Sequence, residues 1–143
     1  MIHGLDTSFV VAVEVTAHAE HLRARRLMDR VLSAGDGLAL APQVLAELIH
    51  IVTDPRRFES PLSVDAARER AERWWNAAEV VSAFPGESTA PLFLSWHRKH
   101  GLGRKRLLDT LLAATYFSND VRSILTTNAR DFRAFGHFTV QQP

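Results

Sequence analysis

The sequence contains no cysteine, which excludes disulfide bonds and thiolate metal sites. It has no apolar run near the roughly 20 residues of a membrane-spanning helix, and we expect no membrane association. Its first residues lack the basic and apolar regions of a secretory signal peptide, so we expect no such leader. GxGxxG and Walker motifs are also missing, which argues against a dinucleotide or P-loop site. These absences suit a cytoplasmic protein.

The charges are nearly balanced, with 17 basic and 16 acidic residues and a formal net charge of +1. This total does not by itself indicate a nucleic acid or a membrane surface as a partner. Hydrophobic residues make up 46% of the 143 residues, as in an ordinary soluble globular protein. The length and the lack of repeats or linkers predict a single domain over residues 1–143.

Short apolar stretches alternate with helical patterns along the chain. We expect a helix after the first strand, capped by Thr7 or Ser8, and a basic loop over residues 101–106. The alternation predicts a parallel sheet with helices on both faces. The expected strands cover residues 2–5, 37–42, 79–84, 121–127 and 138–142. The expected helices cover residues 7–15, 18–35, 42–53, 63–78, 88–101, 107–120 and 128–135.

Acidic residues occur at special places in this pattern. Asp6 ends the first strand, and Asp131 follows the fourth. Glu47 and Asp109 lie on helices among apolar neighbours, where a free carboxylate is costly to bury. In parallel α/β sheets, ligands bind outside the carboxyl ends of the strands. The four acids are therefore candidates for one common site.

Each acid also has a purely structural interpretation. Asp6, Asp109 and Asp131 can cap helices or lie in turns, and Glu47 can face water at the edge of the core. A single alternative explains all of them, namely a carboxylate cluster that binds a divalent cation. Hard cations such as Mg²⁺ take oxygen ligands and can orient and activate a water for attack on a phosphodiester.

Four segments together resemble the PIN-domain family, and most closely its VapC-type ribonuclease toxins. They are GLDTSFVVAV, LALAPQVLAELIHIVTDPRRF with PLS after it, LLDTLLAATY and ILTTNARDF, in that order. The resemblance implies a three-layer α/β/α domain with a central, mainly parallel sheet. It also implies a metal-dependent endoribonuclease that uses Mg²⁺ or Mn²⁺, forms a homodimer and acts as the toxin of a toxin–antitoxin module. A cognate antitoxin would cover the acidic site.

The resemblance extends to individual residues. Asp6, Glu47 and Asp109 match the family's first three metal-binding and catalytic acids, and we take Asp131 as the fourth. Ala129 departs from the family pattern, because many members carry an additional Asp there, and this puts a second metal ion in doubt. Three further residues are expected to support the acids: Thr7 and Thr127 by hydrogen bonds, and Asn128 by its amide oxygen as an alternative last ligand.

An RNA substrate requires cations around an acidic centre, because its backbone is a polyanion. Basic residues that flank the four acids in sequence are candidates for this role, although each can equally be a solvated surface charge. They are Arg56, Arg57, Arg104, Lys105, Arg106 and Arg130. Trp74, Trp75 and Trp96 can stack on bases, but their helical contexts favour packing in the core or at a dimer contact.

Two other functions are compatible with parts of the sequence. The first is an RNA-binding module whose metal site is degenerate at Ala129 and does not cleave. The second is a metal-dependent phosphatase, which typically needs an Asp nucleophile followed by a second Asp two positions later. Asp6 is followed by Thr7 and Ser8 instead. The second alternative is therefore the weaker one.

Overall fold

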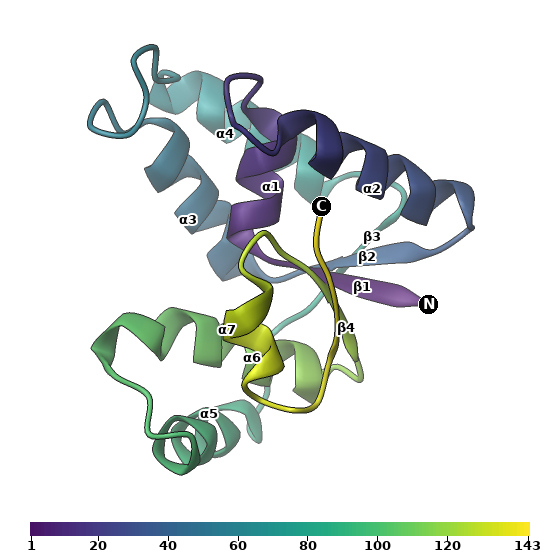
Figure 1. Ribbon diagram of the computed structural model, residues 1–143, viewed down its shortest axis with the longest axis vertical. Coiled ribbons are helices and arrows are strands. Elements are labelled where there is room, and N and C mark those ends of the chain that lie inside the picture. The colour runs from purple at the N-terminus through teal and green to yellow at the C-terminus, as the bar shows by residue number, and fades with distance from the viewer.

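The computed structural model describes residues 1–143, and its centre is a five-stranded sheet in the order β3-β2-β1-β4-β5 (Figure 1). All four strand pairs are parallel. The strands are β1 (Ile2–Leu5), β2 (Gly37–Leu40), β3 (Val80–Ser82), β4 (Ser123–Leu125) and β5 (Thr139–Gln141). This arrangement confirms the parallel α/β sheet that the alternating pattern predicts.

Seven α-helices connect and cover the strands. They are α1 (Thr7–Glu14), α2 (His21–Ser33), α3 (Pro42–Val52), α4 (Val64–Trp75), α5 (Thr89–Lys99), α6 (Leu107–Ser118) and α7 (Ala129–Arg133). None of them combines the length and the apolar character that crossing a bilayer requires. The basic stretch expected as a loop contains a 3-10 turn, η1 (Arg104–Arg106), which leads directly into α6.

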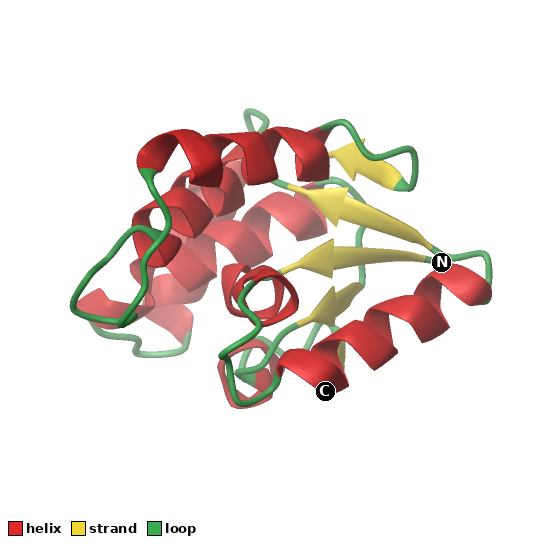
Figure 2. Cartoon of the chain, turned by 90° about the horizontal axis from the view of Figure 1, so that it is seen from above, coloured by secondary structure: helices red, strands yellow, loops and turns green.

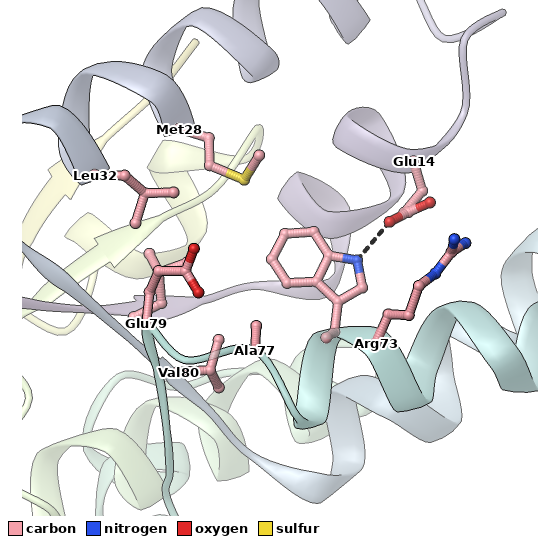
Figure 3. Close-up of a pocket in the computed structure, with 9 residues that line it drawn as sticks. Glu14, Met28, Leu32, Arg73, Ala77, Glu79 and Val80 are labelled. Carbon is pink, nitrogen blue, oxygen red and sulfur yellow. Dashed lines mark hydrogen bonds between the residues drawn. The ribbon is translucent and has the colours of Figure 1, made fainter.

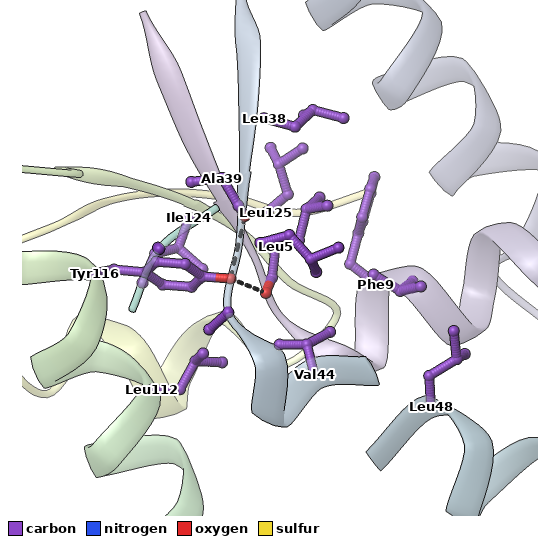
Figure 4. Close-up of a cluster of buried hydrophobic side chains, with 14 of the residues drawn as sticks. Leu5, Phe9, Leu38, Ala39, Val44, Leu48, Leu112, Tyr116, Ile124 and Leu125 are labelled. Atoms are coloured by element: carbon purple, nitrogen blue, oxygen red, sulfur yellow. Dashed lines mark hydrogen bonds between the residues drawn. The ribbon is translucent and has the colours of Figure 1, made fainter. Parts of the chain in front are cut away.

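The core fills both faces of the sheet. Tyr116 of α6 lies on one side of the strands, whereas Phe9 of α1 and Leu48 of α3 lie on the other (Figure 4). All three side chains are almost completely buried. The helices therefore form two outer layers around the sheet, which confirms the three-layer α/β/α architecture.

The N-cap of α1 differs from the expected one. It is Asp6, not Thr7 or Ser8, because the first strand runs directly into the helix without an intervening turn.

The tryptophans pack as expected. Trp74 and Trp96 are buried, with 8% and 5% of their surface exposed, so they lie in the core and do not offer a face to bases. Trp75 is half-buried and packs edge-on against Phe84.

At Gly4, α6 packs tightly against the sheet. A Cβ at Gly4 would lie 2.7 Å from Tyr116 Cδ2. The Tyr116 ring cannot retreat easily, because its hydroxyl donates to the Leu5 carbonyl at 2.6 Å and the Ala39 carbonyl at 3.2 Å. We expect Gly4→Ala to lower the free energy of unfolding by about 1–3 kcal/mol through overpacking. Urea denaturation measures this, and Gly86→Ala, where a Cβ meets nothing within 4 Å, should change it little.

Candidate active site

The carboxyl ends of the parallel strands meet at one edge of the sheet, where the arrowheads lie in Figure 2. A cleft of about 350 Å³ opens at this edge. Asp6, Glu47 and Asp109 line it, although more than a hundred residues separate the first from the last. We call it the acidic cleft. Its other lining residues are Thr7, Ser8, Val11, His18, Ile51, Arg57, Thr127 and Asn128.

Asp6 is the most buried acid of the cleft, with 5% of its surface exposed. Its Oδ2 accepts hydrogen bonds from Ser8 Oγ and Thr126 Oγ1, both at 2.6 Å. Burial raises the pKa of Asp6, and the two hydroxyl hydrogen bonds only partly oppose this. The side chain is thus held in one orientation in a place where its negative charge is unfavourable.

The hydroxyl donors to Asp6 differ from those expected from the sequence. Thr7 Oγ1 is buried without a hydrogen-bond partner, and Thr127 lines the cleft without bonding an acid through its side chain. The strand register explains the difference. Leu5 pairs with Leu125, so the next residue on each strand, Asp6 and Thr126, lie opposite each other.

The loop after β4 stabilises these hydroxyls through its backbone. The Thr127 amide donates to Ser8 Oγ at 3.1 Å, and the Asn128 amide donates to Thr126 Oγ1 at 2.9 Å. Thr127 and Asn128 therefore support Asp6 indirectly, because their main-chain amides bind the two hydroxyls that donate to Asp6. The expectation that the Thr7 and Thr127 side chains bind the acids directly was therefore wrong.

Glu47 enters the cleft from the middle of α3. Pro42 begins α3 only two residues after β2 ends, and this places Glu47 one turn and a half above the sheet edge. Gln43 Nε2 donates to Glu47 Oε1 at 2.9 Å and also to the Leu108 carbonyl at 3.1 Å. Gln43, which the sequence did not single out, therefore links α3 to the start of α6 and orients the Glu47 carboxylate.

Asp109 lies in the first turn of α6. Burial, together with the negative charges of Asp6 and Asp131, raises its pKa to about 6, and Arg106 opposes the shift. Glu47 adds a smaller effect in the same direction as the other acids. The four acids predicted from the sequence are therefore close enough to perturb one another, as expected of carboxylates that share one site.

Asp131 stands beside the acidic cleft on α7 and does not line it. Its Oδ1 lies 3.2 Å from Arg106 Nη1. Arg106 Nε lies 3.5 Å from Asp109 Oδ2, so one guanidinium connects two of the four acids. Arg106 was expected to bind RNA from the surface. Its side chain is instead only 23% exposed and is already paired.

The other basic residues predicted to bind RNA are exposed to solvent. Arg56, Arg104, Lys105 and Arg130 are exposed, and Arg57 is exposed at the rim of the acidic cleft. Arg57 Nε lies 3.7 Å from Asp54 Oδ2, a solvent-exposed pair that binds only weakly. None of these five cations is paired with one of the four acids.

The helix-capping interpretation of the acids is not supported by the structure. Asp6 is the N-cap residue of α1, but its side chain makes no capping hydrogen bond. The N-caps of α6 and α7 are Arg106 and Asn128, again without a side-chain cap. His18 is half-buried and also lines the cleft, where its Nδ1 accepts the Glu20 amide.

A second cavity, of about 230 Å³, lies between α2, α4 and the start of β2 (Figure 3). Its walls are mainly apolar, formed by Met28, Leu32, Leu38, Trp74, Ala77 and Val80. Of its two acids, Glu14 accepts from Trp74 Nε1 and Arg70 Nη1, each at 2.7 Å, and Glu79 is exposed. The acidic cleft gathers three acids instead of two, so it is the candidate active site.

The donor set of the acidic cleft suits a hard divalent cation, because carboxylate oxygens are the preferred ligands of Mg²⁺ and Mn²⁺. Burial is the largest cause of the raised pKa of Asp109, and the repulsion by Asp6 and Asp131 that adds to it is the kind that a bound cation relieves. As the side chains stand, no three acids or histidines are grouped tightly enough to hold one ion. The chemistry fits, and the side chains would have to move to complete a coordination shell.

Comparisons with known proteins agree with this architecture. The family model for the PIN domain matches residues 5–137. No curated protein matches the chain by sequence. Among solved structures, VapC20 of Mycobacterium tuberculosis, described as a toxin that cleaves the sarcin–ricin loop, is similar with a TM-score of 0.74. It is 20% identical, and the alignment covers 100% of both chains.

Two further structures are similar over almost their whole length. VapBC-1 of nontypeable Haemophilus influenzae has a TM-score of 0.69 and 19% identity, with 99% of this chain and 98% of that chain covered. VapBC2 of Rickettsia felis, solved with a DNA fragment from its promoter, has a TM-score of 0.67 and 17% identity, with 100% and 99% covered. At such low identities, these likenesses establish the fold.

Proposed function

The chain belongs to the PIN-domain family, and from that membership we propose that it is a metal-dependent endoribonuclease, the toxin of a toxin–antitoxin module. One observation carries the proposal. Asp6, Glu47 and Asp109 come from separate segments and line one cleft, with Asp131 beside it. A protein that used these acids only for stability would gain little from collecting like charges, because their repulsion opposes folding.

In the proposed site, Asp6, Glu47 and Asp109 would hold Mg²⁺ or Mn²⁺, with Asp131 at its edge. A divalent ion bound there supplies a Lewis acid and lowers the pKa of a water molecule. Ser8 and Thr126 fix the orientation of Asp6 by their hydrogen bonds, and Gln43 fixes that of Glu47. This preorganisation means that the carboxylates need little rearrangement when the charge of the attacking group develops.

The exposed cations explain how a polyanion can approach an acidic cleft. Arg104 and Lys105 precede α6, Arg56 and Arg57 follow α3, and Arg130 lies next to Asp131 on α7. They flank the acid-bearing segments in sequence, and all five are exposed, so they can contact phosphates. We propose that they hold the RNA backbone on either side of the scissile bond, as phosphate contacts generally position a nucleic acid.

This role predicts a measurable salt effect. Arg104→Gln combined with Lys105→Gln should weaken RNA binding and lower the slope of log K against log salt by roughly 1.4, because each contact to a single strand contributes about 0.7. Fluorescence anisotropy with a labelled RNA at several salt concentrations measures the slope. The matched control is Arg68→Gln, an exposed residue of α4 that pairs only with Asp65. An unchanged slope in the double variant would remove these two residues from the interface.

We also propose a protein partner and a dimer. The likeness of this chain to VapBC-1 and VapBC2 supports a cognate antitoxin, which would cover the acidic cleft and block cleavage. A homodimer follows from the VapC resemblance. Co-expression of the chain with the product of the neighbouring gene, followed by size-exclusion chromatography with light scattering, tests both.

The decisive experiment for the activity is cleavage of total cellular RNA by the purified protein, with and without Mg²⁺ or Mn²⁺. Metal-dependent cutting at discrete positions is expected, and mapping of the fragment ends identifies the substrate. Binding of RNA without cutting, in the presence of either ion, would favour the non-cleaving module instead. Release of phosphate from a small phosphate ester without RNA cleavage would favour the phosphatase.

A further inference from the structure

Arg106 is the basic side chain that pairs with two of the four acids. Its Nη1 lies 3.2 Å from Asp131 Oδ1 and its Nε lies 3.5 Å from Asp109 Oδ2. Its Nη2 also donates to the main-chain carbonyl of Asp131. The guanidinium therefore contacts α6 through Asp109 and α7 through Asp131. The side chain is 23% exposed. The guanidinium is held by the protein and is not a mobile surface charge.

The position of Arg106 follows from the local fold. The turn η1 ends at Arg106, which is the N-cap residue of α6, and this places it three residues before Asp109 on the same side of the helix. Arg104 and Lys105, its two basic neighbours, are exposed. One residue of the basic run thus turns inward and the other two remain outside.

Few side chains on the α7 side of the site could bind a second divalent cation. Asp131 is the only carboxylate among residues 128–133, and Ala129 is buried with 3% exposed. A divalent ion needs several oxygen ligands. The Asp131 carboxylate already interacts with Arg106, so it would have to leave this pairing to become a metal ligand. The other three acids line the cleft. Of these, only Asp109 has a cationic partner, Arg106.

We propose that the Arg106 guanidinium takes the place of a second divalent cation, so that the site binds one ion through Asp6, Glu47 and Asp109. The inference rests on the proposed function. Arg106 is a positioning residue in this scheme: it compensates Asp131 and one side of Asp109 with a permanent positive charge. That charge stays in place at every metal concentration, because arginine does not deprotonate in proteins.

The test is a titration of the metal-free protein with MnCl₂, in which electron paramagnetic resonance counts the unbound ions. The wild type should bind one ion. Arg106→Met, which keeps the length of the side chain and removes its charge, should open a second, weaker site that uses Asp131. Adding Asp131→Asn to this variant should close the second site again. Arg133→Met, an exposed residue on the same helix as Asp131, is the matched control and should bind one ion.

Asp131→Asn alone tests the same point in a chain that keeps Arg106. If Arg106 replaces the second ion, this variant should bind one Mn²⁺ with an affinity within about twofold of the wild type. A tenfold loss would identify Asp131 as a ligand of the bound ion and overturn the inference, even if Arg106→Met does not fold.

The outcomes separate this inference from the function on which it rests. Two ions in the wild type, or one ion in a folded Arg106→Met variant, overturns the role of Arg106 and leaves the metal-dependent nuclease intact. No ion in the wild type at millimolar Mn²⁺ overturns both.

Discussion

Asp6→Asn is expected to reduce RNA cleavage by at least about 100-fold while leaving the chain folded. Loss of a group that merely supports a metal ligand typically costs about 10–100-fold in affinity or activity, so loss of a ligand should cost no less. The amide keeps the size of the carboxylate and can still accept from Ser8 and Thr126. Initial rates of cleavage of one RNA substrate, at saturating Mg²⁺ or Mn²⁺, measure the effect.

The same substitution should not lower stability in the absence of metal. Asp6 is buried and its pKa is raised, so its negative charge opposes folding near neutral pH. Removing that charge should keep or raise the melting temperature. Asp29→Asn, on the exposed face of α2, is the matched control and should retain full activity. A variant at Asp6 that loses stability and activity together would indicate a structural role instead of a catalytic one.

The sequence allowed the sheet edge and its acids to be predicted for a physical reason. A short apolar strand followed by an acid places that acid at the carboxyl end of the sheet, and Asp6 lies there. Glu47 and Asp109 were harder to predict from spacing alone, because they lie within helices. Their apolar neighbours indicated that they are not ordinary surface residues, and both line the acidic cleft.

The hydrogen-bond partners of Asp6 could not be predicted from the sequence. Thr126 and Thr127 are adjacent and chemically identical, and only the pairing of Leu5 with Leu125 decides which one faces Asp6. A shift of one residue in the pairing of β1 with β4 would place a different residue after β4 beside Asp6. Local pattern does not fix register between strands that are far apart in sequence.

Arg106 illustrates a signal that was present in the sequence but not used. Three basic residues in a row look equivalent, yet Lys105 and Arg106 lie four and three residues before Asp109, the spacings of neighbours on one helix face, and Arg104 does not. The structure pairs Arg106 with Asp109. A basic run before a helix is therefore better divided by its spacing from nearby acids than taken as one surface patch.

The metal-free protein should become less stable as the pH rises from 5 to 7.5, through the effect of Asp109. Its pKa is raised to about 6 from 3.8, so in this range the folded chain binds more protons than the unfolded chain. The free energy of unfolding therefore falls with pH, by about 1–1.5 kcal/mol for this group over this range, since each pKa unit corresponds to about 1.4 kcal/mol and about half of the full effect lies below pH 5. Urea denaturation in the presence of a chelator, at the two pH values, measures the change.

Asp109→Asn isolates this contribution, because the other titrating groups are the same in both proteins. The difference in unfolding free energy between variant and wild type should grow with pH in the metal-free state. Saturating Mn²⁺ should reverse the trend for the wild type, since a bound cation favours the ionised carboxylates and stabilises only the folded chain. If the difference does not depend on pH, the pKa of Asp109 is not raised in the folded chain as the structure indicates. If Mn²⁺ stabilises wild type and variant equally, Asp109 is not among its ligands.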